Sequence, residues 1–153
     1  MIETVLPYVW MVFLAMPGPL LWVINTETIL VYQVQQGLDP LALALCAAVG
    51  QVGTFLILYA LGEQALMRIG FFARRIEAWP PEKRLKLRSS TTAGLVSGGL
   101  FGIPPVIVVA PFSSTVHYPR VKMCAIVFVT RLVRFSALTM GGERVLEWMG
   151  WGG

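Results

Sequence analysis

The sequence PRVKMCAIVFVTRLVRFSALTMGG, residues Pro119–Gly142, decides the fold class of this chain. From Lys122 to Gly142 it is largely apolar, and as a helix it would be about 31 Å long at about 1.5 Å per residue. That length matches the roughly 30 Å hydrocarbon core of a bilayer. The stretch therefore predicts a transmembrane helix, with two arginines, Arg131 and Arg134, near its middle.

Arginine at membrane depth is unfavourable by about 2.5 to well over 10 kcal/mol, so both side chains are expected to face protein or a water-filled cavity. At i and i+3, Arg131 and Arg134 project from one face and can hold one anionic group together. Two interpretations stay open. The arginines bind an anionic or lipidic substrate, or they pair with internal carboxylates and only hold the helices together.

The composition indicates an all-α integral membrane protein in which residues 1–153 form a single membrane domain. The chain is 56% hydrophobic and only 13% charged, whereas soluble domains average about 25% charged residues. The excess of Lys and Arg lies mostly in one hydrophilic segment, which favours a role in membrane topology over nucleic-acid binding. No Ser/His/Asp set, paired carboxylates, metal cluster or phosphate loop is present, so we expect neither an enzyme nor a cofactor.

The first apolar stretch, Thr4–Ile24, is interrupted by Pro17, Gly18 and Pro19. Because two prolines remove two backbone donors, the chain is expected either to kink here or to turn back as a re-entrant hairpin shielded by other helices. Glu27 follows in a semi-apolar run. It is either an exposed loop carboxylate or a buried counter-ion, and the residues alone leave both open.

The clearest second span is Pro40–Leu61, which is uncharged and long enough to cross a bilayer. We expect its helix to end at Gly62. Small residues recur every third position and leave a groove for a neighbouring helix. These small residues are Ala47, Gly50 and Gly53. Gln51 and Thr54 are polar at membrane depth and are expected to bond across to a neighbour.

The hydrophilic segment Glu63–Ser90 carries seven basic and three acidic residues, which predicts a cytoplasmic location by the positive-inside rule. Apolar residues alternate with these charges, as in an amphipathic helix lying on the membrane surface. The basic residues are either a topology signal alone or a binding surface for anionic lipid headgroups.

The third apolar stretch, Thr91–Tyr118, is broken by Pro104 and Pro105. If it crossed the membrane, Arg120 and Lys122 would lie outside, against the positive-inside rule. We therefore expect a second re-entrant hairpin that enters and returns on the cytoplasmic side. Its glycines at i, i+4 and i+8 predict a face for close helix packing. They are Gly94, Gly98 and Gly102.

The same plan occurs twice, as a proline-broken hairpin followed by a full span that ends in Gly-Glu. Repeat 1 covers about residues 4–62, repeat 2 about residues 91–142, and residues 143–153 form an interfacial tail. The equivalent positions are Pro40, Cys46, Gly62 and Glu63 in the first repeat and Pro119, Cys124, Gly142 and Glu143 in the second. Since the two spans would cross in opposite directions, the sequence predicts an inverted repeat, which is typical of transporters.

With these residues in view, the sequence resembles the VTT-domain (DedA) superfamily of small membrane proteins, nearest its YqaA-like branch, over about Pro17–Phe135. The similar parts are the proline turn and Glu27, the Tyr59-Ala60-Leu61-Gly62 end of the first span, Ile103-Pro104-Pro105, and Arg131-Leu132-Val133-Arg134-Phe135. In the second turn, Val106 and Ile107 stand where relatives carry glycine with a charged residue.

The resemblance implies a bacterial inner-membrane protein that translocates or scrambles a lipid or lipid phosphate and supports membrane homeostasis. Arg131 and Arg134 would bind the anionic group, and Glu27 would be their counter-charge when the site is empty. The partners would be membrane lipids and, since two spans and two hairpins offer little lateral surface, a second copy of the chain or another membrane subunit. The alternatives are a non-transporting structural or interaction subunit and an exporter of small ions or drugs.

Overall fold

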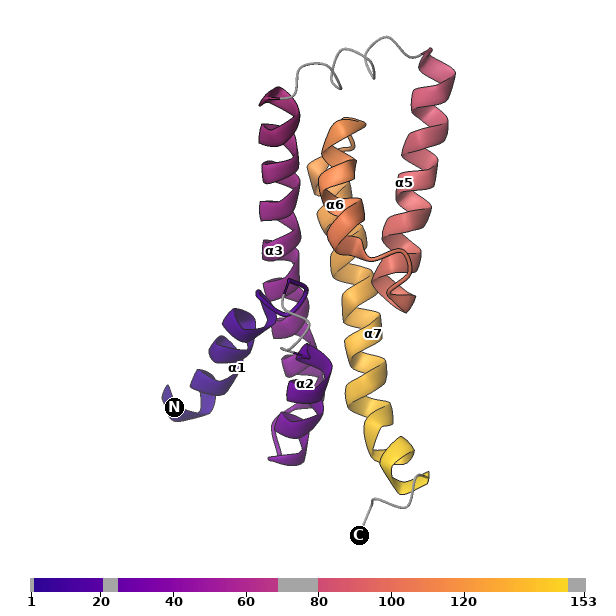
Figure 1. Cartoon of the computed structure of the whole chain (residues 1–153). Coiled ribbons are helices and arrows are strands. Elements are labelled where there is room, and N and C mark those ends of the chain that lie inside the picture. Colours follow the sequence, from indigo (N-terminus) through magenta and orange to yellow (C-terminus); the bar gives the residue numbers. More distant parts are fainter. Residues whose placement is uncertain (1, 21–24, 69–79, 149–153) are drawn as a thin grey trace. The chain divides into compact units, whose positions relative to one another are not determined.

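The computed structural model describes residues 2–20, 25–68 and 80–148, and within these ranges the chain forms helices and short connections without a strand (Figure 1). Two helices contain stretches long and apolar enough to cross a membrane, Pro40–Gln64 and Arg120–Gly141. The predicted all-helical fold with two candidate spans is therefore confirmed. The helices are α1 (Ile2–Ala15), α2 (Thr26–Gln35), α3 (Pro40–Arg68), α5 (Pro81–Phe101), α6 (Val106–Thr115) and α7 (Arg120–Trp148).

The chain divides into two compact units, and both long helices contribute to each. The first unit consists of residues 1–51 and 131–153, so it contains α1, α2, the start of α3 and the end of α7. The second unit consists of residues 52–130 and contains the rest of α3, α5, α6 and the start of α7.

In the first unit, α1 packs against a part of α3 that carries small side chains. Ala47 and Gly50 are buried. A Cβ atom on Gly50 would collide with the carbonyl oxygen of Val12 and lie 3.1 Å from the Cβ atom of Ala15. Gly50 therefore permits a close approach of the two backbones, which is the predicted use of small residues in this helix.

The connection from α2 to α3 is a tight turn whose residues suit their positions. Gly37 has a φ of 85°, a conformation in which glycine carries no steric penalty. Asp39 caps α3, because its side chain accepts hydrogen bonds from the backbone N–H groups of Leu41 (2.8 Å) and Ala42 (3.0 Å). The backbone N–H of Asp39 donates to the hydroxyl of Tyr8 at 3.0 Å, which ties this turn to α1.

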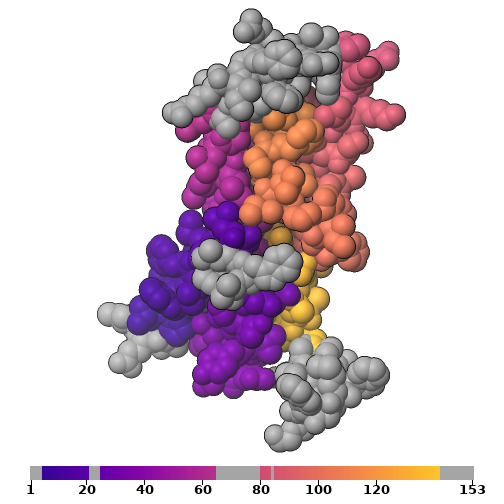
Figure 2. Space-filling model, viewed as in Figure 1, coloured from indigo at the N-terminus to yellow at the C-terminus, as the bar shows by residue number. Residues whose placement is uncertain are grey.

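The second unit has a core of its own, in which α6 packs against α5. Figure 2 shows the surface of α6 between those of α5 and the C-terminal part of α3. The core residues are Phe55, Tyr59, Leu95, Val106, Val109, Ala110, Val116, Tyr118, Met123 and Val127. The hydroxyl of Tyr59 donates to the carbonyl oxygen of Tyr118 at 2.8 Å, so the polar end of this buried ring is satisfied.

The predicted glycine face of α5 is only partly a packing surface. A Cβ atom on Gly98 would collide with the carbonyl oxygen of Pro104, whereas one on Gly94 would lie at an ordinary 3.6 Å from Val109. Gly102 instead ends α5 in the left-handed conformation, with a φ of 81°. Gly99 is not one of the three glycines predicted from the i, i+4, i+8 spacing. It is nevertheless the other tight position, because a Cβ atom there would collide with Thr130.

The boundaries predicted around the hydrophilic segment were wrong. The helix does not end at Gly62 but continues to Arg68, because the residues that follow Gly62 are strong helix formers. Gly62 lies at a close approach instead, since a Cβ atom there would be 2.7 Å from the carbonyl oxygen of Pro111. The amphipathic surface segment predicted over residues 63–90 therefore begins inside α3 and ends inside α5, and its part from 69 to 79 lies outside the described residues. Likewise, α7 continues to Trp148, so the predicted tail 143–153 begins as helix.

Candidate anion site

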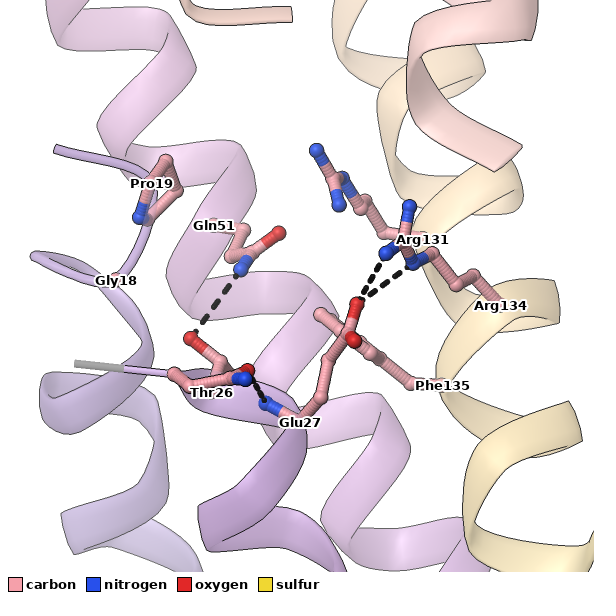
Figure 3. Close-up of a pocket in the computed structure, with 9 residues that line it drawn as sticks. Gly18, Pro19, Thr26, Glu27, Gln51, Arg131, Arg134 and Phe135 are labelled. Atoms are coloured by element: carbon pink, nitrogen blue, oxygen red, sulfur yellow. Dashed lines mark hydrogen bonds and ion pairs between the residues drawn. The ribbon is translucent and has the colours of Figure 1, made fainter. Parts of the chain in front are cut away.

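The start of α2 sets the position of Glu27. Asn25 is the N-cap, and its side-chain oxygen accepts a hydrogen bond from the backbone N–H of Glu27 at 3.0 Å. Glu27 lies in the first turn, where a carboxylate is favoured by the partial positive charge of the helix N-terminus. From this turn the side chain extends toward α7 (Figure 3).

Glu27 forms an ion pair with Arg134. The Nε atom of Arg134 donates to Oε1 of Glu27 at 2.7 Å, and the Nη2 atom of Arg134 pairs with the same oxygen. The side chain of Arg134 is 25% exposed and that of Glu27 is 32% exposed. Glu27 is therefore a half-buried counter-ion in the first turn of α2, and the alternative of an exposed loop carboxylate was wrong.

Arg131 lies one turn before Arg134 on α7 and lines the same pocket (Figure 3). The structure thus brings together all three side chains predicted as the substrate-binding set. With two guanidinium groups and one carboxylate, the set has a net positive charge while Glu27 is ionised. Their role in binding a substrate stays a prediction.

Two further polar residues complete the site. Gln51 on α3 is only 4% exposed, and its Nε2 atom donates to the hydroxyl oxygen of Thr26 at 3.5 Å. The Oε1 atom of Gln51 is buried and has no hydrogen-bond partner among the described residues. The expectation that Gln51 bonds across to a neighbouring helix is therefore confirmed. That Gln51 lines the same pocket as the arginines was not predicted. The signal that could have indicated it was the glutamine itself, a polar residue in a largely apolar span.

These side chains line a pocket of about 260 Å³ that lies within the first unit. Gly18 and Pro19 from the proline turn and Phe135 from α7 form other parts of its wall. A water molecule takes about 30 Å³ in the liquid, so the pocket has room for a phosphate-sized group with several waters. Guanidinium groups bind such oxyanions through paired hydrogen bonds.

The other residues predicted from the sequence lie elsewhere. Pro104, Pro105 and the glycines of α5 belong to the second unit and do not line this pocket. Over residues 2–20, 25–68 and 80–148, no group of three His, Cys, Asp or Glu side chains is placed to hold a metal ion. Cys46 and Cys124 are free thiols.

Comparison of the chain with protein-family models, with curated proteins and with solved structures gives no match.

Proposed function

We propose that the chain is an integral membrane protein that translocates or scrambles a lipid or lipid phosphate, with Arg131 and Arg134 as the anion-binding groups. The observation that carries the proposal is the Glu27–Arg134 ion pair beside a polar pocket, on a helix long and apolar enough to cross a membrane. Arg134 is 14 residues beyond the start of that stretch, about 21 Å along a helix from one end and about 10 Å from the other, so it lies within the apolar span.

The distribution of exposed side chains supports a membrane location. Soluble monomers rarely expose large contiguous apolar surfaces. Here the helices carry many exposed large apolar side chains, as a surface in contact with lipid would require. On α1, α3 and α7 they are Val5, Leu6, Val9, Trp10, Phe13, Leu41, Leu45, Val49, Leu56, Ile57, Leu61, Val121, Val129, Val133 and Met140.

The lengths of the shorter helices favour re-entrant hairpins. At about 1.5 Å per residue, α1 with 14 residues is about 21 Å long, and α2 and α6 with 10 residues each are about 15 Å. None of the three reaches the roughly 30 Å needed to cross the hydrocarbon core. In the proposal, α1 with α2 and the end of α5 with α6 enter the membrane and return on the same side.

The helix order supports an inverted repeat. The short helices α2 and α6 have 10 residues each, and the long helices α3 and α7 have 29 each. The number of positions from the start of α2 to the start of α3 is the same as from the start of α6 to the start of α7. The turn before each long helix contains a residue with positive φ, Gly37 in one and His117 in the other. Gly62-Glu63 and Gly142-Glu143 keep this register. Cys46 and Cys124 do not keep it, and neither do Pro40, the first residue of α3, and Pro119, which precedes α7.

The repeat register also indicates that the charged site is single. Gln51 and Arg131 take equivalent positions, but the position of Glu27 corresponds to Ile107 and that of Arg134 to Thr54. A second anion site of the same composition is therefore not expected in repeat 2. This asymmetry gives the substrate one binding site, as a transporter with one midplane site requires.

In the proposed mechanism, Glu27 neutralises Arg134 while the site is empty. An incoming phosphate group hydrogen-bonds to Arg131 and Arg134 and competes with the carboxylate for the guanidinium group. The phosphate thereby exchanges part of its hydration for protein donors, which lowers the free-energy barrier to its passage across the membrane. When the phosphate leaves, Glu27 pairs with Arg134 again.

The test is the rate at which fluorescent phospholipid exchanges between leaflets of liposomes that contain the purified protein. Arg134→Gln should reduce the rate to that of protein-free liposomes. The matched control is Arg120→Gln, since Arg120 is also an α7 arginine in an ion pair, with Glu63, and lies at the end of the helix outside the pocket. Equal rates for the two variants would contradict the proposal.

A structural or interaction subunit is the second candidate function, because the same ion pair joins α2 to α7 and would stabilise the first unit by itself. In that case the liposomes would show no protein-dependent exchange, and Arg134→Gln would lower the melting temperature as its only effect.

A further inference from the structure

The second unit contains a groove of about 700 Å³ that the anion site does not use. One face of α5 forms a wall of the groove, and the chain from Tyr118 to Lys122 forms the other. Leu85, Ala93 and Val96 make its lining partly apolar, and the side chains of Leu85 and Val96 are exposed. The hydroxyl groups of Thr92 and Tyr118 are 2.8 Å apart and hydrogen-bond across it.

Two cationic side chains line the same groove. Arg88 donates to the carbonyl oxygens of Val116 (3.2 Å) and His117 (3.1 Å), which holds its guanidinium group in place at the end of α6. The ammonium group of Lys122 lies 5.8 Å from the centre of the Tyr118 ring. Within the described parts of the chain the ion pairs are Arg120–Glu63 and Arg134–Glu27, so no carboxylate there neutralises Arg88 or Lys122.

We propose that this groove binds one anionic phospholipid, with its phosphate at Arg88 and Lys122 and the start of an acyl chain along Ala93 and Val96. Lys122 lies close to the start of the candidate span Arg120–Gly141, which is the level of the headgroups if α7 crosses the membrane. The inference therefore rests on the membrane location in the proposed function, but not on lipid translocation.

The combination of charge and apolar surface identifies the occupant. A free phosphate ion would use the two cations but gain nothing from the apolar half of the groove. A zwitterionic lipid would use the apolar half, but its positive headgroup would oppose the cations. An anionic phospholipid complements both halves, since headgroup charge and buried acyl surface contribute separately to binding.

The experiment is native mass spectrometry of the full chain in detergent, titrated with phosphatidylglycerol, phosphatidylcholine or glycerol phosphate. In a background carrying Arg134→Gln, which removes binding at the anion site, we expect one retained phosphatidylglycerol molecule, weaker retention of phosphatidylcholine and none of glycerol phosphate. Lys122→Gln should weaken phosphatidylglycerol binding about fivefold, as expected for one basic residue near the membrane surface. The matched control is Lys83→Gln, which removes the same charge from α5 at an exposed position outside the groove.

In that background, equal affinity for phosphatidylglycerol with and without Lys122→Gln would overturn the inference, as would equal weakening by Lys83→Gln. Binding of glycerol phosphate as strong as that of the lipid would also overturn it, because the apolar half would then have no role. The failure of the proposed function gives a different result. In that case Arg134→Gln would leave leaflet exchange unchanged while Lys122→Gln still weakened lipid retention.

Discussion

Arg134 offers Glu27 two nitrogen atoms, Nε and Nη2, and this geometry makes lysine an informative replacement at position 134. Lysine keeps the positive charge but presents a single ammonium group in place of the planar fork that matches a phosphate. Arg134→Lys should therefore reduce leaflet exchange by about tenfold or more, the effect of losing one charge-assisted hydrogen bond. The melting temperature should change little, because a charge pair with Glu27 survives. Unchanged exchange in this variant would count against phosphate binding at Arg134.

Gly98 and Gly141 provide a second contrast between single residues. A Cβ atom on Gly98 would collide with the carbonyl oxygen of Pro104, whereas one on Gly141 would have no atom within 4 Å. Gly98→Leu should therefore destabilise the protein by about 1–3 kcal/mol or more through overpacking. Gly141→Leu should be close to neutral. Melting curves of the two variants in detergent are the check, and equal melting temperatures would argue against close packing at Gly98.

For single residues, the sequence identified the charged groups of the site but not its shape. Helical geometry places Arg131 and Arg134, at i and i+3, on one face. Because burying an arginine at membrane depth is unfavourable, both side chains were predicted to need a partner. Glu27 could not be assigned in advance, because its environment depends on contacts between helices distant in sequence. The same holds for Gln51, whose contact with Thr26 exists only once α2 packs against α3.

At the scale of the elements, the hairpin made by the end of α5 with α6 leads to a prediction of membrane topology. If it enters and returns on one side, Lys83 before it and His117 after it lie on the cytoplasmic side. Single cysteines at these exposed positions, in a background without Cys46 and Cys124, should both be protected from an impermeant thiol reagent in intact cells. After the membrane is permeabilised, both should react. Labelling of only one of the two in intact cells would mean that the segment crosses the membrane.

The existence of most elements could be predicted from the sequence, but several boundaries could not. Prolines mark the starts of α3, α5 and α7, and the apolar length of the two spans is visible directly. Glycine was the misleading signal. Gly62 suggested a helix end, yet its helix continues because strong helix formers follow. Glycine is needed at this position because a side chain would block the close approach to Pro111. Gly102 does end a helix, and only its φ of 81° distinguishes the two cases.

At the scale of the whole molecule, the central claim is that the Glu27–Arg134 pair serves lipid translocation in addition to stability. Removing one partner leaves the other charge in a partly buried site, so Glu27→Gln and Arg134→Gln should each lower stability by about 1–3 kcal/mol. The double variant, Glu27→Gln with Arg134→Gln, leaves no charge unpaired at this position and should recover most of that loss.

The most direct test is leaflet exchange of an anionic phospholipid in liposomes that contain the wild type or this double variant, with the melting temperature of each protein measured in parallel. Our account predicts rapid exchange with the wild type and none above the protein-free rate with the double variant, although the double variant melts close to the wild type. Exchange at the wild-type rate in the double variant would contradict the claim. So would the absence of protein-dependent exchange in the wild type itself, and the ion pair would then be a structural contact alone.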